Sequence, residues 1–244
     1  MHAGARAPAA TSGIVSLERA FFLRVPDIAP VDLTRVDAGE YPSNAGAAIA
    51  GPEWGIVSSA QVDDGAGLAA PAGAAAESLA QFDYTNDDDI EVVDHVQNGT
   101  AFAIGLYGAA VETTTLRNYG NVSVSAESVY GDAAAYGALA SAGGAGIGLM
   151  INGGDIQVDA SAGDGARADA TGIYVVADVA SIFNDGSVSA TATAGDGGLA
   201  DARAARSYGS YTNVSNYGAL TASATADGGT ATARGADSLG LLGS

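Results

Sequence analysis

The stretch Asn152-Gly153-Gly154-Asp155-Ile156-Gln157-Val158 is one copy of a motif, Asn-x-Gly-x-(Ile/Val/Leu)-x-(Val/Ala), that recurs along the second two-thirds of the chain. The marker asparagines of the copies are Asn86, Asn118, Asn152, Asn184 and Asn216, so the steps are 32, 34, 32 and 32 residues. A repeat of this length is typical of a stacked, quasi-one-dimensional protein. The sequence therefore predicts a parallel β-solenoid and not a globule with one central site.

The residues around each asparagine alternate between apolar and polar, which indicates strands with one buried face. The residues two before and four after the marker are all apolar or aromatic: Tyr84, Leu116, Met150, Ile182 and Val214, then Ile90, Val122, Ile156, Val188 and Leu220. Eight residues after the marker the chain has alanine in every copy except the first, which has Asp94. A thin core lined by alanine is predicted.

A second strand-like stretch follows 19 or 20 residues after each marker, beginning at Gly105, Gly137, Gly172, Ala204 and Gly235. Glycine-rich links such as Ala162-Gly163-Asp164-Gly165 suit corners, because glycine adopts positive φ angles without steric cost. Each repeat is thus interpreted as strand, corner, strand, corner, and one elongated turn per repeat is favoured over two short ones.

The marker asparagine and the glycine two residues later have predicted structural roles. Asparagines at the same place in successive coils can form an amide ladder. The glycines at 120, 154, 186 and 218 are expected to make a tight bend with a left-handed residue. The first copy has Asp88 in place of this glycine, which suggests a terminal, capping coil.

Proline usage divides the chain, because all six prolines precede residue 72 and proline removes a hydrogen-bond donor from a strand ladder. Residues 1–71 are expected to be a non-repetitive, poorly structured leader. Residues 72–83 are expected to include a short capping helix over Ala74 to Phe82. Residues 84–244 are expected to form a parallel β-helix of about five units, the last incomplete.

Composition narrows the classes of partner. The chain has 244 residues, a formal net charge of −19, no cysteine and no lysine, with a mean hydropathy of +0.18 and a pI of about 4.1. A strongly negative electrostatic potential repels nucleic acid and anionic membranes, so neither is expected as a partner. No apolar run is long enough for a transmembrane helix, and thiolate metal sites and disulfides are excluded.

The repeated motif, together with following segments such as Ala170-Thr171-Gly172-Ile173, resembles the passenger region of bacterial type V autotransporters and related adhesins. The resemblance covers roughly residues 84–240. It implies a right-handed, single-stranded parallel β-helix that is secreted or displayed on the bacterial cell surface or outer membrane. The membrane is then expected to be reached only through a β-barrel domain that this chain does not contain, so the chain is either a fragment or a passenger with a separately encoded barrel.

Few side chains suggest chemistry. The acidic group of the first coil is the strongest candidate for a Ca²⁺ site or for the paired carboxylates of a sugar-cleaving enzyme; it contains Asp83, Asp87, Asp88, Asp89, Glu91 and Asp94. An acidic cap that protects an open sheet edge is favoured over both. The Gly-Asp-Gly corners at Asp164 and Asp196 do not match the nine-residue period of Ca²⁺-binding β-rolls, and His2 and His95 have no evident partners. No catalytic residue, cofactor-binding residue, metal site or cofactor is predicted.

Three functions remain open at this point. The first is a non-enzymatic, surface-exposed adhesin or structural stalk that contacts host cells, matrix or other cells. The second is a polysaccharide-degrading enzyme with carboxylates in the first coil. The third is a self-assembling structural protein whose open coil ends stack between chains.

Overall fold

The computed structural model describes residues 59–63, 80–143 and 145–240, and within these residues every regular element is a β-strand. The strands form three parallel sheets. Sheet A contains β1 (Ser59–Asp63), β3 (Ile90–Val96), β6 (Val122–Ser128), β9 (Asp155–Ala162), β12 (Ser187–Ala194) and β15 (Ala219–Ala226). Sheet B contains β4 (Ala101–Ala110), β7 (Ala133–Ala142), β10 (Arg167–Val176), β13 (Leu199–Gly209) and β16 (Thr230–Gly240). Sheet C contains β2 (Gln81–Asn86), β5 (Thr113–Asn118), β8 (Ile147–Asn152), β11 (Val179–Asn184) and β14 (Tyr211–Asn216).

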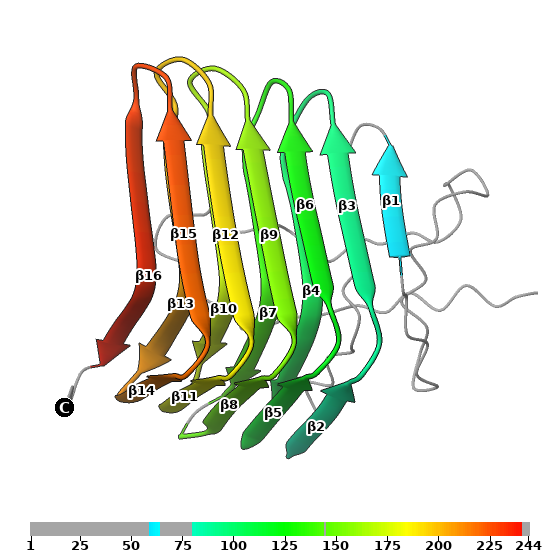
Figure 1. The fold of residues 1–244 in the computed structure, drawn as a ribbon, viewed down its shortest axis with the longest axis vertical. Coiled ribbons are helices and arrows are strands. Elements are labelled where there is room, and N and C mark those ends of the chain that lie inside the picture. The colour runs from blue at the N-terminus through cyan, green and yellow to red at the C-terminus, as the bar shows by residue number, and fades with distance from the viewer. Residues whose placement is uncertain (1–58, 64–79, 144, 241–244) are drawn as a thin grey trace, which may run out of the picture. The chain divides into compact units, whose positions relative to one another are not determined.

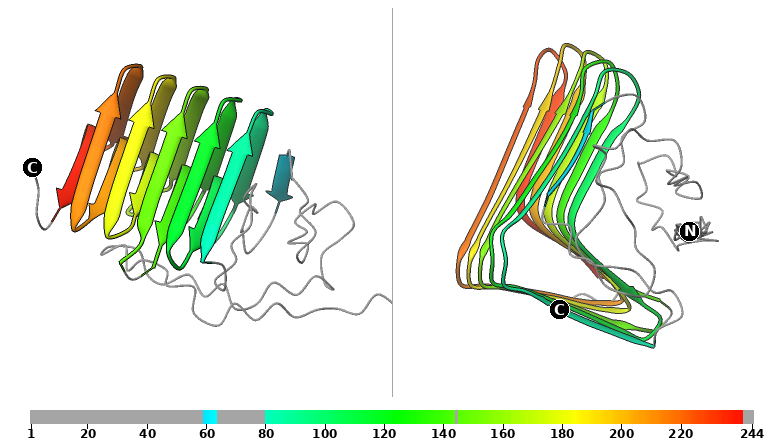
Figure 2. Two further views of the ribbon diagram at one scale, coloured as in Figure 1. Left: turned by 90° about the horizontal axis from the view of Figure 1, so that it is seen from below. Right: turned by 90° about the vertical axis from the view of Figure 1, so that its right-hand side faces the viewer.

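One repeat is one turn of a solenoid, as predicted. Each strand pairs in parallel with its equivalent one coil further on, so that Asn152 lies beside Asn184 and Ile156 beside Val188. In Figure 1 the chain ascends sheet A, descends sheet B behind it and advances toward the C-terminal end, which makes the winding right-handed. Seen along the axis in Figure 2 (right), the coils superpose into a three-sided outline in which sheet B bends toward the interior.

Each turn contains three strands, whereas the sequence predicted two. The stretch around each marker asparagine is not one strand. It is the end of a sheet C strand, a corner and the start of a sheet A strand, as in β8 and β9. The alternation of buried and exposed side chains continues across this corner, so periodicity alone could not reveal the break.

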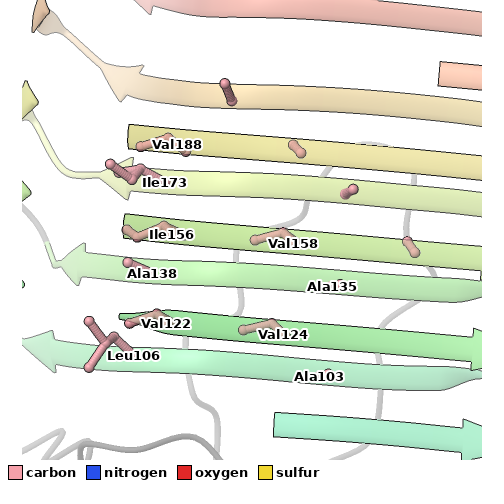
Figure 3. Close-up of a cluster of buried hydrophobic side chains, with 14 of the residues drawn as sticks. Ala103, Leu106, Val122, Val124, Ala135, Ala138, Ile156, Val158, Ile173 and Val188 are labelled. Atoms are coloured by element: carbon pink, nitrogen blue, oxygen red, sulfur yellow. The ribbon is translucent and has the colours of Figure 1, made fainter. Parts of the chain in front are cut away.

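The core lies between the three sheets and consists of the predicted inward rows. Val122, Val124, Ile156 and Val158 of sheet A face residues such as Ile173 of sheet B (Figure 3). The next inward position toward the end of the sheet A strands from β6 onward is alanine, as in Ala126, Ala160 and Ala192. Small side chains in this row allow sheets A and B to approach each other closely.

Sheet B bends at a row of close contacts between sheets. The glycines of this row lie inside the strands and not at their starts, because β4, β7 and β10 begin four or five residues earlier. A Cβ atom on Gly105 would lie 2.5 Å from Cγ1 of Val122, and one on Gly172 would lie 2.2 Å from Cγ1 of Val188. The absence of a side chain at Gly105 and Gly172 therefore lets the bent strand touch sheet A.

The predicted asparagine ladder is present at the corner between sheets C and A. The Nδ2 atoms of Asn86, Asn118, Asn152 and Asn184 donate to Oδ1 of the asparagine in the next coil at 2.8, 2.9, 2.7 and 2.7 Å. Each amide also donates to the main-chain oxygen two residues on, for example Gly154 at 2.9 Å. The first four asparagines are buried, at no more than 1% exposure. The ladder thus closes the corner and connects all five coils.

The glycine two residues after each marker does not adopt the left-handed conformation predicted for it. The glycines with positive φ among the described residues are Gly99, Gly165, Gly197 and Gly228. Gly154 and Gly186 are required for a different reason, since a Cβ atom on either would lie 2.0 Å from the main-chain oxygen of the equivalent glycine in the preceding coil. The constraint is contact between coils, which a single repeat does not show.

The N-terminal boundary also differs from the prediction. Residues 59–63, assigned from the sequence to a poorly structured leader, form β1 and pair with β3 in sheet A. Residues 81–83, assigned to a capping helix, lie in strand β2 because they continue the inward alternation of sheet C. The remaining leader residues and residues 72–79 lie outside the described part of the chain.

The ladder predicts that an internal asparagine contributes more to the free energy of unfolding than a terminal asparagine does. Asn152→Ala removes bonds to both neighbouring coils and leaves buried amide groups without partners, so we expect a loss of about 2 to 4 kcal/mol in the free energy of unfolding. Asn216 is exposed and bonds to one neighbouring ladder asparagine in the described stack, so Asn216→Ala should cost about 1 kcal/mol or less. Urea denaturation of both variants measures the difference. Equal losses would show that the ladder does not stabilise the stack.

The contact between coils predicts that Gly186→Ala is destabilising. The added methyl group collides with the main-chain oxygen of Gly154, so the coils must separate, at a cost of about 1 to 3 kcal/mol in the free energy of unfolding. Gly235→Ala is the matched control, because its Cβ would have no neighbour closer than 3.8 Å. Thermal and urea unfolding should leave the control within about 0.5 kcal/mol of the wild type.

Candidate functional site

The acidic residues of the first coil do not form one site. Asp94 points into the core and is fully buried, whereas Asp87, Asp88 and Glu91 are exposed. Asp83 lies on the outer face of sheet C and pairs with Arg117. Among the described residues no group of three or more His, Cys, Asp or Glu side chains has the geometry to hold a metal ion. The fold therefore separates the buried carboxylate of Asp94 from the exposed carboxylates of Asp87, Asp88 and Glu91.

Asp94 occupies the inward row that is alanine in the following coils. Its Oδ2 accepts the main-chain N–H of Phe102 at 2.7 Å, and its Oδ1 has no hydrogen-bond partner. Phe102 belongs to β4, which is the edge strand of sheet B in the described stack. Burial raises the pKa of Asp94 to about 6, against the opposing effects of the Phe102 N–H and of His95. The carboxyl group thus accepts a hydrogen bond from the edge strand β4. Its ionisation while buried lowers the free energy of unfolding.

The other candidates from the sequence have structural roles. Gly165 and Gly197 adopt φ angles of 68° and 69°, and Oδ1 of Asp164 accepts the main-chain N–H of Asp196 at 3.0 Å. The Gly-Asp-Gly links are therefore stacked corners, as expected. His95 lies on the outer face of sheet A, with Nδ1 3.1 Å from Oε2 of Glu127. His2 lies outside the described residues.

The outer face of sheet B carries an aromatic row that sequence reasoning missed. Phe102 and Tyr136 have ring centroids 5.8 Å apart, and Tyr136 and Tyr174 stack at 6.4 Å. The guanidinium of Arg206 lies 5.1 Å from the centre of the Tyr174 ring. All four side chains are buried although they belong to no part of the solenoid core. Burial also raises the pKa of Tyr174, which the nearby Arg206 opposes.

Beyond this row, charged side chains continue along sheet B toward the C-terminal coils. Nε of Arg203 lies 3.4 Å, Nη1 of Arg234 3.5 Å and Nε of Arg206 3.9 Å from the same carboxylate oxygen of Asp237. In β10, one coil before β13, Nε of Arg167 lies 2.6 Å from Oδ2 of Asp169. Burial raises the pKa of Asp169, and the nearby Arg167 opposes the shift. The spacing of Arg203, Arg206 and Arg234 in the sequence was the available signal for this cluster.

The outer face of sheet C carries a group of apolar side chains in its later coils. All three outward positions of β8 are aliphatic, namely Ile147, Leu149 and Ile151, and Phe183 of β11 lies beside Ile151. The exposed fractions of Ile147 and Phe183 are 47% and 39%. None of the nine outward residues of β8, β11 and β14 is charged. These residues are Ile147, Leu149, Ile151, Val179, Ser181, Phe183, Tyr211, Asn213 and Ser215. We call these nine residues the sheet C patch.

Apolar patches of this kind mark contact surfaces on soluble proteins, because exposed apolar area is costly in water. The patch stands out against a net charge of −19. Its sequence signal is the stretch Ile147 to Ile151, where apolar residues lie on both faces of a strand. That signal was not recognised because the inward row alone explained the repeat.

Comparison with known proteins supplies no further assignment: no protein-family model, curated protein or solved structure matches the chain. No helix of sufficient length and apolar character to span a bilayer occurs in residues 59–63, 80–143 or 145–240. The architecture itself assigns the described chain to the parallel β-helix class.

The environment of Asp94 predicts a defined pH dependence of stability. The pKa in the folded chain is raised above the ordinary value of 3.8, so the ionised form opposes folding. The penalty is absent well below pH 3.8, grows as the pH rises from about 4 to 6 and is complete near pH 7, at about 3 kcal/mol. In Asp94→Asn this loss of unfolding free energy between pH 4 and 7 should disappear.

Urea denaturation at several pH values checks this expectation. The matched control is Asp155→Asn, which neutralises an exposed carboxylate on the outer side of sheet A. The difference in unfolding free energy between wild type and Asp94→Asn must grow between pH 4 and pH 7, and this growth must exceed any change seen with the control. A pH-independent difference for Asp94→Asn would contradict the assignment.

Proposed function

We propose that the protein is a non-enzymatic attachment module, a β-helical passenger that is secreted or displayed on a bacterial surface and binds host cells, matrix or other cells as an adhesin or as part of an adhesive stalk. The observation that supports a binding role most directly is the sheet C patch. It offers nine outward positions without charge on an otherwise acidic protein.

The partner that fits this patch is the apolar surface of another protein. A flat sheet face presents its side chains at fixed spacing, so little conformational entropy is lost when a partner binds. A few well-packed residues near the centre of a contact contribute most of the binding free energy. Leu149 and Phe183 both lie next to Ser181, which is the middle position of the patch, and Asn213 lies on the side of Ser181 away from Leu149.

The stalk component of the proposal is supported by the continuity of the stack. The asparagine ladder and the in-register sheets connect every coil to the next, so force on one coil is shared by its neighbours. Each coil extends the stack by roughly 4.8 Å, the separation of neighbouring strands in a sheet. The interior of the stack is filled by aliphatic side chains, which suits a rigid spacer.

A paired substitution tests the role of the sheet C patch. Leu149→Asp with Phe183→Asp places two charges beside the middle position of the patch, and we expect binding to cells or matrix proteins to weaken at least about 30-fold, equivalent to about 2 kcal/mol. Thr193→Asp with Ser223→Asp on the outer face of sheet A is the matched control. It adds the same charge to a polar face. Surface plasmon resonance or a cell-binding assay provides the measurement, with circular dichroism to verify folding.

The outcomes separate the parts of the proposal. Loss of binding only in the sheet C variant supports attachment through the patch. Equal loss in both variants shows that contact occurs elsewhere or depends on charge alone. If the wild type binds no cell, matrix protein or surface protein tested, the attachment role is wrong.

A further inference from the structure

Two asparagines in the chain are followed directly by glycine, namely Asn98 and Asn152. This dipeptide has an intrinsic chemical reactivity. Because glycine has no side chain, its main-chain nitrogen reaches the carboxamide carbon of the preceding asparagine with little steric hindrance. The local structure therefore decides which of the two asparagines reacts.

Asn98 is in an open environment. It lies in the bend between β3 and β4, where residues 97–100 are all exposed. Gly99 has a φ of 102°, and a Cβ atom built on it would have no neighbour within 4 Å. The side chain of Asn98 and the nitrogen of Gly99 thus have the space that ring closure requires.

Asn152, in contrast, has no space for ring closure. It is fully buried, and its carboxamide makes three hydrogen bonds, to Asn118, Asn184 and the main-chain oxygen of Gly154. The nitrogen of Gly153 donates to the main-chain oxygen of Asn118 at 2.8 Å. Both the nucleophile and the carbon that it would attack are fixed by the ladder.

We propose that Asn98 is a site of spontaneous modification, at which the folded protein converts this residue to aspartate and isoaspartate while the ladder protects Asn152. The main-chain nitrogen of Gly99 loses its proton and attacks Cγ of Asn98, a new N–Cγ bond forms, and the Cγ–Nδ2 bond breaks. Nδ2 leaves as ammonia with the proton that balances it. Water then opens the five-membered imide at one of its two carbonyls, giving either product, and no oxidant or reductant takes part.

The modification changes the corner between sheets A and B in the first coil. Either product adds one negative charge, and isoaspartate also adds a methylene to the main chain. The second coil rests on this corner: Oγ of Ser128 donates to the oxygen of Gly99 at 2.7 Å, and the N–H of Tyr130 donates to the oxygen of Gln97 at 3.1 Å. We therefore expect the isoaspartate form to hold the first coil less firmly than the unmodified chain.

Peptide mass mapping of the full chain tests the proposal. The protein is incubated at mildly alkaline pH and 37 °C, once folded and once in concentrated urea, and conversion of amide to acid is followed at Asn98 and Asn152 in the same samples. In the folded sample Asn98 should convert at least about tenfold faster than Asn152, because Asn152 reacts only after local opening. In urea the two rates should become similar.

Asn98→Gln provides the matched variant, since its longer side chain forms the corresponding ring far more slowly. This variant should lose conversion at position 98 and retain the wild-type thermal stability after incubation, whereas the incubated wild type should melt lower. Equal rates at Asn98 and Asn152 in the folded chain would overturn the proposal. So would a folded Asn98 that stays intact over a period in which the denatured chain converts.

Discussion

Direct stacking of equivalent side chains in consecutive coils is the constraint on which this structure depends. Asn118 bonds to Asn152 and Asn152 to Asn184, and the same register holds along all three sheets. A parallel stack without offset demands that each interior position suit the same environment in every coil. This explains why the inward rows are apolar apart from a few residues such as Asp94 and Ser128, and why the corner glycines of consecutive coils lie in contact.

The first coil shows how the regular pattern changes at an edge. Asp94 replaces the inward alanine and accepts the N–H of Phe102 on a strand that has no sheet B neighbour before it among the described residues. An inward-facing charge is one of the means by which β proteins discourage further strands from pairing with an edge. The arrangement lowers stability at neutral pH, because the carboxyl group is ionised while buried. Edge protection and stability are in conflict at this residue.

The interior is uniform, whereas the three outer faces differ. Sheet A presents serine and threonine in its later coils, sheet B presents an aromatic row that leads into paired charges, and sheet C presents the uncharged sheet C patch. Outward positions are free to vary since they do not contribute to the stack, so specific function on a solenoid resides there. The binding role is therefore proposed from an outer face, whereas the asparagine ladder supports only the stalk component.

The sequence alone determined the parallel solenoid, the inward rows and the ladder, because a 32-residue period and strand alternation report local constraints that repeat in every coil. The break between sheets C and A was invisible, since alternation continues through the corner at Asn152. Only the tertiary structure decided that Gly186 is needed for contact with Gly154, that Asp94 caps an edge, and that Ile147, Leu149 and Phe183 form one surface. These features arise between coils, where residues about 32 positions apart meet, so a single repeat shows at most a part of each.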